Sequence, residues 1–341
     1  MNIFKKKIPV AYTVVFAVVL SGVSIFLSQK FSTSAALAKQ GANNTATADC
    51  KNYNVARLKG YTYVSPLVSQ EPECESPRLA ALKQDITGLI ESEKQGGLIT
   101  SASVFIKEMS SDDWTCVNPD ETFMPGSLFK LPVLITILRM AENDPGFLNK
   151  KIVCDPKVLV NIPQTYTSKS VQAGKSYTIK ELLTYMIVYS DNGATQLLNQ
   201  NMNTDILIKV FTDLGLQAPK ADPRSYLTYK IHTREYSIFM EALYNGSYLT
   251  INQSEYATSL LAQCNFTEGL VKGLPANVKI AHKFGEAGIG DAHELHETGI
   301  IYMNNDAYIV TVMTRGNDLK KLPLTISEIS AKVYAFMTRH S

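Results

Sequence analysis

Ser127 and Lys130 have the types and the spacing of a nucleophile and its base. Ser127 stands at the head of an apolar stretch, directly after Pro125 and Gly126. Because a helix repeats every 3.6 residues, a side chain three positions later lies on the same face, and the Lys130 amine can touch the hydroxyl. A serine hydroxyl is a weak nucleophile until a base takes its proton, and an amine in a dry pocket is such a base. We therefore predict that Ser127 is the nucleophile and Lys130 its general base.

Two further polar motifs follow in the chain. The tripeptide Ser190–Asn192 occupies a turn between two helical stretches, where polar side chains can point into a cleft. The tripeptide Lys283–Gly285 lies on the first strand after the helical stretches. Two ammonium groups near one pocket raise the cost of protonating either, so Lys283 favours a neutral Lys130. Each motif is common by chance, whereas the three together are a much stronger signal.

The order of these motifs resembles that of the penicillin-recognising serine enzymes, and most closely that of the class A β-lactamase family. The matching residues are Ser127-x-x-Lys130, Ser190-Asp-Asn192 and Lys283-Phe-Gly285, and the resemblance covers roughly residues 78–340. It implies that Ser127 is acylated and that Lys130 activates it. Ser190 would relay a proton to the leaving nitrogen.

The resemblance also implies how the substrate is held. Asn192 would hydrogen-bond the amide side chain of the substrate, and Lys283 would face its carboxylate. The backbone N–H groups of Ser127 and Glu286 would form the oxyanion hole, where the loss of one donor typically costs roughly 10²–10³ in rate. The implied substrate-binding residues are therefore Asn192, Lys283, Gly285 and Glu286, with Asp191 supporting the turn from behind.

The chain departs from the family pattern in two places. Phe284 stands where the family has Thr or Ser, so a hydroxyl that helps Lys283 grip the substrate carboxylate is missing. The family also carries a glutamate, on a loop after the Ser-Asp-Asn motif, that positions the water for hydrolysis of the acyl-enzyme. No glutamate occurs between Asn192 and Arg234. Acylation and turnover therefore become separate questions.

The acidic residues near that loop do not have the family's sequence context. Asp213 and Asp222 are the acids between 213 and 233, and Asp222 reads as a turn residue. Glu235 and Glu241 lie on the next helix, where we expect a solvated face for both. We assign a deacylating role to none of the four.

Three functions remain open. The first is hydrolysis of β-lactams through an ester on Ser127. The second is a D,D-peptidase or esterase that acts on cell-wall peptides, since wider relatives deacylate without that glutamate. The third is a β-lactam-binding sensor or a pseudoenzyme. Only Met1–Lys7 precede the apolar run, so we expect no cytoplasmic signalling domain, which disfavours a sensor.

The elements that must position these motifs form an α+β pattern. We predict a five-stranded antiparallel sheet flanked by N- and C-terminal helices, with an inserted all-helical subdomain and the site in the cleft between them. Thr178 and Glu181 have the spacing of a capping box. Strands are expected at 99–106, 114–117, 278–284, 299–303 and 307–313, and helices at 79–90, 178–189, 204–214, 233–244 and 325–338. Residues 285–290 read as a flexible glycine-rich turn.

The N-terminal segment predicts export. Lys5–Lys7 precede the uncharged run Ile8–Ser28, which is long enough to span a bilayer as an anchor with the lysines inside. A small-x-small site ending at Ala38 offers the alternative of a cleaved signal. We divide the chain into a stub and anchor (1–28), an extracytoplasmic spacer with an irregular lead-in (29–77) and a hydrolase domain (78–341). Within that domain the sheet part is 78–126 and 275–341, and the helical part is 127–274.

Composition excludes some partners. The 33 basic and 31 acidic residues leave a net charge of +2, which argues against nucleic acid. Residues His293–Glu297 lack the H-E-x-x-H pattern, and we expect neither a metal nor a cofactor. Tyr229 and Arg315 are candidate substrate contacts from position alone, and we favour their interpretation as ordinary surface residues. Five cysteines leave at least one unpaired, and Cys50 with Cys74 is the bridge we consider. We expect a monomer whose partners are the membrane and a small β-lactam or D-alanyl peptide.

Overall fold

The computed structural model describes residues 52–144, 146–159, 164–220, 228–303 and 306–340. All of them belong to the compact unit Cys50–Ser341. The apolar run Ile8–Ser28, the small-residue site at Ala38 and the polar spacer lie outside these ranges. Among the described residues, no helix combines the length and the apolar character that crossing a bilayer requires.

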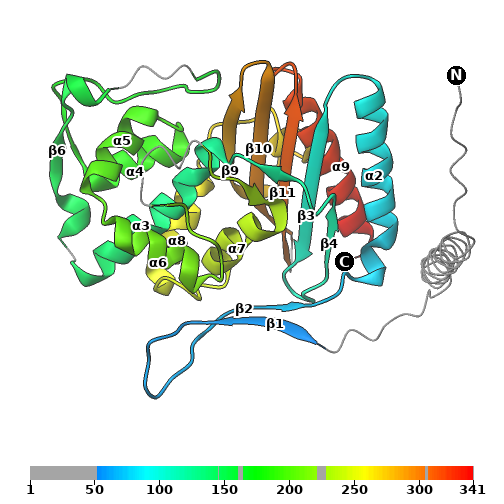
Figure 1. Cartoon of the computed structure of the whole chain (residues 1–341), viewed down its shortest axis with the longest axis horizontal. Helices are drawn as coiled ribbons and strands as arrows, with labels where there is room; N and C mark the ends of the chain where they lie inside the picture. The colour runs from blue at the N-terminus through cyan, green and yellow to red at the C-terminus, as the bar shows by residue number, and fades with distance from the viewer. Residues whose placement is uncertain (1–51, 145, 160–163, 221–227, 304–305, 341) are drawn as a thin grey trace, which may run out of the picture. The chain divides into compact units, whose positions relative to one another are not determined.

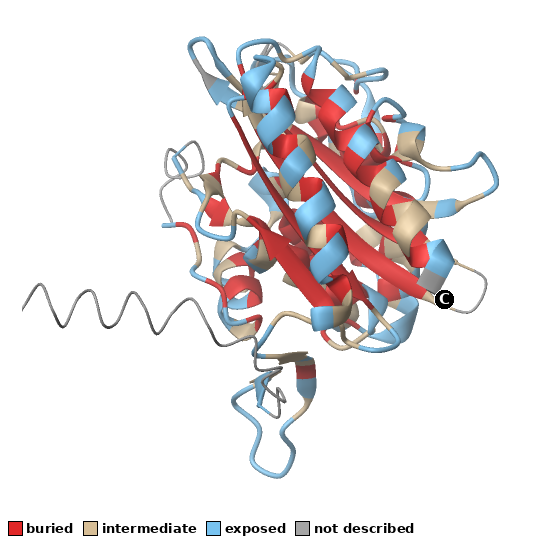
Figure 2. Cartoon of the chain, turned by 90° about the vertical axis from the view of Figure 1, so that its right-hand side faces the viewer, coloured by how far each residue is buried: buried red, intermediate tan, exposed pale blue. Residues whose placement is uncertain are grey.

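A five-stranded antiparallel sheet forms the centre of the unit, in the order β4-β3-β11-β10-β9 (Figure 1). Two helices, α2 (Ala80–Gln95) and α9 (Leu322–His340), lie side by side over one face of it, as Figure 2 shows. Buried aliphatic side chains from the sheet and both helices fill the layer between them. The strands are β3 (Ser101–Glu108), β4 (Trp114–Val117), β9 (Lys279–Ile289), β10 (Ala292–Tyr302) and β11 (Ala307–Gly316). The predicted α+β sheet with flanking helices is confirmed.

A helical part packs against the other face of the sheet. Helix α7 lies directly on β3 and β11, where the Ser237 hydroxyl donates a 2.8 Å hydrogen bond to Thr311 Oγ1. The capping box predicted at Thr178 is present, since Thr178 and the Glu181 side chain each bond the other's backbone N–H. The helices are α3 (Lys130–Asn143), α4 (Ile179–Val188), α5 (Asn192–Asn201), α6 (Thr204–Asp213), α7 (Thr233–Tyr244) and α8 (Ile251–Leu261).

Short elements connect these parts. Two small antiparallel pairs are β5 (Thr122–Phe123) with β8 (Ile231–His232), and β6 (Lys151–Val153) with β7 (Ser176–Thr178). The 3₁₀ helices are η1 (Pro77–Leu79), η2 (Gly126–Phe129), η3 (Phe147–Asn149), η4 (Pro156–Val158) and η6 (Leu270–Gly273).

Strands β9 and β10 correct one prediction. Residues 285–290, expected as a flexible turn, belong to β9 as far as Ile289 and pair residue by residue with β10. The turn comprises only Gly290 and Asp291, with Gly290 at φ +63°. A tight two-residue hairpin turn requires positive φ, so one glycine suffices for it. The glycine-rich composition did not distinguish this turn from the strand before it.

The segment before the hydrolase domain is more regular than predicted. Strands β1 (Tyr53–Arg57) and β2 (Leu67–Pro72) form an antiparallel hairpin in place of the irregular lead-in. Its inward face packs on the helical part, with Val68 buried and Ala56 and Leu58 partly buried. The lead-in is therefore an ordered part of the compact unit.

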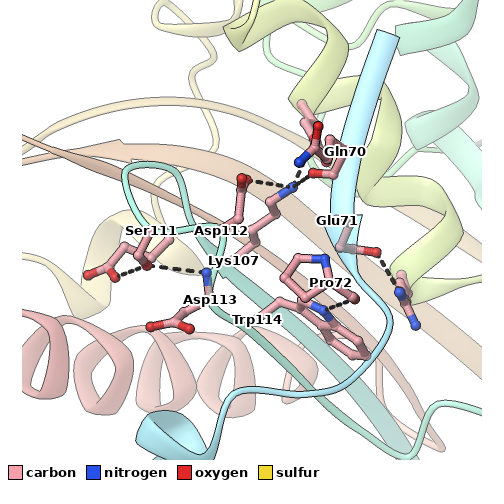
Figure 3. A network of polar contacts seen from close by, with 11 residues as sticks. Gln70, Glu71, Pro72, Lys107, Ser111, Asp112, Asp113 and Trp114 are labelled. Carbon is pink, nitrogen blue, oxygen red and sulfur yellow. Dashed lines mark hydrogen bonds and ion pairs between the residues drawn. The ribbon is translucent and has the colours of Figure 1, made fainter. Parts of the chain in front are cut away.

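A buried lysine joins this hairpin to the domain (Figure 3). Lys107 on β3 is fully buried, and its amine donates hydrogen bonds to the Glu241 carboxylate at 2.8 Å and to the Gln70 carbonyl at 3.3 Å. The Asp112 carboxylate completes the site at 3.3 Å. Burial raises the pKa of Glu241, whereas Lys107 lowers it, and burial dominates. The Glu241 and Asp112 carboxylates thus balance the charge of a lysine that is buried between the sheet and the hairpin.

A second contact secures the end of the hairpin. Trp114 donates a 2.8 Å hydrogen bond from Nε1 to the carbonyl oxygen of Pro72. The Arg234 guanidinium stacks 3.8 Å from the centre of the Trp114 ring and forms an ion pair with Glu71 at 2.5 Å. The hairpin is thus fixed to β3, β4 and α7 by polar contacts as well as by apolar packing.

The cysteines divide into two classes. Cys74 is disulfide-bonded. Cys116, Cys154 and Cys264 are buried free thiols. The expected partner of Cys74, Cys50, lies outside the described residues.

Candidate active site

The turn that carries Ser127 packs backbone to backbone against the edge strand β9. Gly126 has φ +54°, and a Cβ placed on it would lie 2.1 Å from the carbonyl oxygen of Glu286. A Cβ on Gly285 would lie 2.6 Å from the nitrogen of Leu128. Only glycine fits at both positions. Ser127 is half-buried in η2, and its hydroxyl makes no hydrogen bond to any described residue.

Lys130 hydrogen-bonds Ser190, whereas the sequence spacing predicted that its amine touches the Ser127 hydroxyl. Its amine donates hydrogen bonds to the carbonyl oxygen of Ser190 and, at 3.1 Å, to the Ser190 hydroxyl. Ser190 has φ +57°, a left-handed conformation that is uncommon for a residue with a side chain. Ser127 lies in the 3₁₀ turn η2, which ends where α3 begins at Lys130.

Both lysines of the candidate site have lowered pKa values. Burial and the nearby charge of Lys283 hold the pKa of Lys130 well below its ordinary value. Burial lowers the pKa of Lys283 to about 8, against the opposing effects of Cys264, Glu297 and Glu286. The predicted influence of Lys283 on Lys130 is confirmed in direction. A neutral Lys130 amine can accept a proton, which a general base must do.

The Ser190–Asn192 turn is held as predicted. Asp191 is 3% exposed and caps α5, accepting hydrogen bonds from the backbone N–H groups of Gly193 and Ala194. It also accepts the N–H of Val171 at 3.2 Å. Asn192 begins α5, and its side-chain amide makes no hydrogen bond to the described residues, which leaves it available to a substrate.

Phe284 and Lys283 lie buried on β9. The Phe284 ring stacks on Phe266 with centroids 4.5 Å apart and meets the edge of Tyr166 at 6.1 Å. The Lys283 amine donates a 3.0 Å hydrogen bond to the carbonyl oxygen of Phe284 and lies 4.0 Å from the centre of its ring. An aromatic cluster thus occupies the position where the family carries a substrate-binding hydroxyl.

A loop that sequence reasoning missed joins Ser190 to β9. Gln164 donates a 3.0 Å hydrogen bond from Nε2 to the Ser190 carbonyl oxygen. The Glu286 carboxylate accepts the backbone N–H groups of Thr165 and Tyr166, both at 3.0 Å. These loop residues belong to no motif, and their backbone bonds leave no trace in the sequence. Glu286 therefore has a side-chain role in addition to the oxyanion role predicted for its N–H.

Two buried side chains hold the backbone three residues before Ser127. Glu294 accepts the N–H of Met124 at 2.9 Å, and His296 donates from Nε2 to the Met124 carbonyl oxygen at 3.0 Å. The N–H of Thr314 donates to Nδ1 of His296, which assigns the ring proton to Nε2. Both ring nitrogens of His296 are therefore engaged by the protein's own backbone.

Arg315 holds Glu294 in place and is therefore not the ordinary surface residue that the sequence indicated. Its Nε donates a 2.8 Å hydrogen bond to Glu294, and its Nη2 donates to the carbonyl oxygen of Thr122. Burial alone would raise the pKa of Glu294, but His296 and Arg315 together hold it below its ordinary value. Glu294 is thus a carboxylate that can accept the Met124 N–H.

The described acidic residues considered for deacylation form hydrogen bonds with other parts of the protein. Asp213 accepts hydrogen bonds from Tyr248 and Lys209, and Glu235 forms a capping box at the start of α7. Glu241 is buried against Lys107, so the solvated face predicted for it is wrong. Asp222 lies outside the described residues. No described carboxylate hydrogen-bonds Ser127, Lys130 or Asn192.

The fold agrees with comparisons to known proteins. A family model described as the Beta-lactamase enzyme family matches residues 81–337. The chain belongs to this β-lactamase enzyme family. It is 27% identical over 225 residues to β-lactamase VEB-1 from Pseudomonas aeruginosa, which covers 60% of this chain and 74% of that protein.

Solved structures share the fold of this β-lactamase family member at low sequence identity. PBP-A is 22% identical with a TM-score of 0.64, covering 78% of this chain and 98% of PBP-A. A class A β-lactamase from Mycobacterium abscessus is 18% identical with a TM-score of 0.65, covering 74% and 99% of the two chains. A point mutant of PBP-A, 21% identical with a TM-score of 0.64 over 76% and 97%, is an acyl-enzyme complex with penicillin G.

Proposed function

We propose that this family member is an exported serine hydrolase that reacts with β-lactams through an ester on Ser127 and turns over slowly. One observation carries the proposal. A hydroxyl without a hydrogen bond to the described residues stands three positions from a buried amine whose pKa is lowered, and that amine bonds the Ser190 hydroxyl at 3.1 Å. Membership of the β-lactamase enzyme family supports this chemistry.

The residues can divide the acylation step among them. Ser127 Oγ attacks the lactam carbonyl carbon as its proton passes to the neutral Lys130 amine. The resulting oxyanion meets the N–H groups of Ser127 and Glu286. When the C–N bond breaks, the proton on Lys130 passes through the Ser190 hydroxyl to the leaving nitrogen. The product is an ester on Ser127 with the ring opened.

Hydrolysis of that ester is expected to be the slower of the two steps. It requires a water and a base, and the described carboxylates considered for that role, Asp213, Glu235 and Glu241, are bonded to other partners. Lys130, neutral again after the first step, is the base that remains close to Ser190. We therefore infer slow deacylation with Lys130 in this role.

A D,D-peptidase or esterase acting on cell-wall peptides is the second candidate. The absence of glutamate between Asn192 and Arg234 favours it, because such a chemistry tolerates a long-lived β-lactam adduct. The acyl-enzyme captured with penicillin G in a PBP-A mutant makes a β-lactam a suitable probe for both candidates.

We also propose that the domain lies outside the cytoplasm, anchored by Ile8–Ser28. The support is the run itself, its flanking lysines and its length. Retention of the protein in carbonate-washed membranes, with the N-terminus intact by mass, is the expected result. A soluble chain that begins after Ala38 would replace the anchor with a cleaved signal.

Intact-mass spectrometry with benzylpenicillin tests the chemistry. The full chain in detergent is sampled over time, while hydrolysed product is measured in the same tubes, and Ser127→Ala is the matched control. A mass increase of one penicillin that decays as product accumulates supports slow β-lactam hydrolysis. A lasting adduct without product favours the peptidase, and a D-alanyl peptide is then the next substrate. Labelling of Ser127→Ala at the rate of the parent protein would overturn the assignment.

A further inference from the structure

Exposed hydrophobic side chains are concentrated on the β1–β2 hairpin. Six of the ten large hydrophobic residues that are exposed within the described ranges lie there, although the hairpin is a small part of the chain. Tyr63 at the tip is 97% exposed, and Val64 beside it is 60% exposed. We call the six the outer hairpin surface: Tyr53, Val55, Tyr61, Tyr63, Val64 and Leu67.

The strand members of this surface are exposed, while their neighbours pack on the domain. Tyr53 and Val55 are two positions apart and so point to the same side of β1. Leu67 pairs with Arg57 across the hairpin, beyond a register shift between Ala56 and Arg57. Ala56 and Val68 pack on the domain instead. The apolar side chains of the hairpin therefore divide between a packed face and the exposed outer surface.

The outer surface also carries positive charge. Arg57 and Lys59 lie in and beside the loop, and no acidic residue occurs between Asp49 and Glu71. Arg57 donates a 2.6 Å hydrogen bond to the Ser65 carbonyl oxygen, which ties the two sides of the loop together. Tyrosines combined with cations are typical of segments that lie at a membrane surface, where rings enter the headgroup layer and cations meet anionic lipids.

The hairpin presents this surface rigidly. Gln70 and Pro72 accept hydrogen bonds from Lys107 and Trp114, and Glu71 pairs with Arg234. Figure 1 shows the loop of the hairpin projecting away from the rest of the domain. A surface fixed in this way does not need to be ordered when it binds, which lowers the entropy cost of docking.

The length of the chain before the hairpin indicates which partner the outer hairpin surface contacts. The apolar run ends at Ser28, and 24 residues separate it from Tyr53. A random-coil chain of that length has a root-mean-square span of roughly 25–30 Å. A linker of this length would limit how far Tyr53 can lie from the bilayer that holds the run. We propose that the outer hairpin surface docks on the outer leaflet of that bilayer, an inference that rests on the proposed anchor.

Depth-dependent quenching in proteoliposomes tests this docking. The full chain is reconstituted in vesicles of zwitterionic and anionic phospholipid, with a fraction of the lipid brominated near the headgroup. Trp114 is the only tryptophan and is 4% exposed, so the parent protein gives a low background. Tyr63→Trp is the probe, and Val153→Trp, at a position 63% exposed on β6, is the matched control.

The proposal expects brominated lipid to quench Tyr63→Trp at least twofold more than Val153→Trp. Adding Lys59→Glu to Tyr63→Trp should reduce that quenching. Equal quenching of the two probes in protein that resists carbonate extraction would overturn docking and leave the anchor intact. Extraction by carbonate would instead refute the anchor. An anionic cell-wall polymer is tested in the same way. If it shifts the emission of Tyr63→Trp while brominated lipid does not quench it, the partner of the outer hairpin surface is that polymer and not the bilayer.

Discussion

His296 holds the backbone of Met124, donating a hydrogen bond of 3.0 Å to its carbonyl oxygen three residues before Ser127. Glu294 accepts the N–H of the same residue. Two side chains of β10 therefore fix the backbone that leads to the nucleophile. Misplacement of a reacting group by about 1 Å can cost roughly 10²-fold in rate.

His296→Phe should slow acylation of Ser127 roughly 10- to 100-fold, because it releases Met124 while keeping a ring in the strand. Stopped-flow acylation by a chromogenic cephalosporin measures the rate constant and the binding constant separately. The loss should fall on the rate constant. His293→Phe, on the same strand but half-buried, is the control. A weaker binding constant with an unchanged rate would contradict the positioning role.

Lys130→Ala should slow acylation by roughly 10²–10⁴, the range expected when a general base is removed. The lowered pKa of this amine is the physical reason, since it is neutral at a pH where an ordinary lysine is charged. Intact-mass time courses give the rate. Lys320→Ala, at an exposed position, should leave it unchanged. Equal rates for the two variants would exclude Lys130 as the base.

Acylation should depend on pH at both ends. Lys130 must be neutral, so the rate should fall as pH decreases through its lowered pKa. Lys283 must be charged to attract a carboxylate, so the rate should fall again as pH rises through about 8. With a thioester donor that has no carboxylate, the fall in rate at high pH should disappear, whereas the fall at low pH should remain. Rate profiles for penicillin and such a thioester make the comparison, and identical high-pH limbs would show that Lys283 does not face the carboxylate.

Phe284→Thr should increase the second-order rate of acylation by penicillin about tenfold, because it supplies the missing hydroxyl beside Lys283. It should also destabilise the domain by a few kcal/mol (Phe→Ala in a core typically costs about 3–5), since Phe266 and Tyr166 lose their packing partner. Chemical denaturation and kcat/KM are measured on the same preparation. Phe266→Leu disturbs the cluster without adding a hydroxyl, and a rate gain there would attribute the effect to loosened packing.

Lys107→Met should lower the free energy of unfolding by about 3–5 kcal/mol, because it leaves Glu241 buried without its partner. The double variant Lys107→Met with Glu241→Leu should recover most of that loss, since neither charge then remains in the interior. Urea denaturation followed by far-UV circular dichroism gives both values. Additive losses in the double variant would argue against a coupled pair.

The sequence predicted the elements that have a clear period or cap. Helix α7 and strand β4 lie where they were expected, and Thr178 caps α4 as its spacing indicated. Periodic burial and local capping are properties of neighbouring residues, so a single sequence records them. The hairpin β1–β2 was missed because three prolines interrupt its surroundings and its loop is long.

The site was predictable where a residue type dictates its chemistry. The lowering of the Lys130 pKa by Lys283 followed from charge, whereas the support of the turn by Asp191 was implied by the family resemblance. The Lys130–Ser190 bond was not predicted, because it joins residues 60 positions apart and depends on a left-handed Ser190. The contacts of Gln164 and Glu286 join segments far apart in the chain through backbone groups, which are the same in every sequence.

The frame around Ser127 is made largely of main-chain atoms, since Gly126 and Gly285 bring the turn and β9 into direct contact. These main-chain contacts use atoms that every residue carries. Most substitutions that alter what the site accepts can therefore accumulate one at a time without displacing the nucleophile. The two glycines are exceptions, as are Glu294 and His296, which hold Met124. Over long divergence the two glycines should change far less than the aromatic cluster beside them.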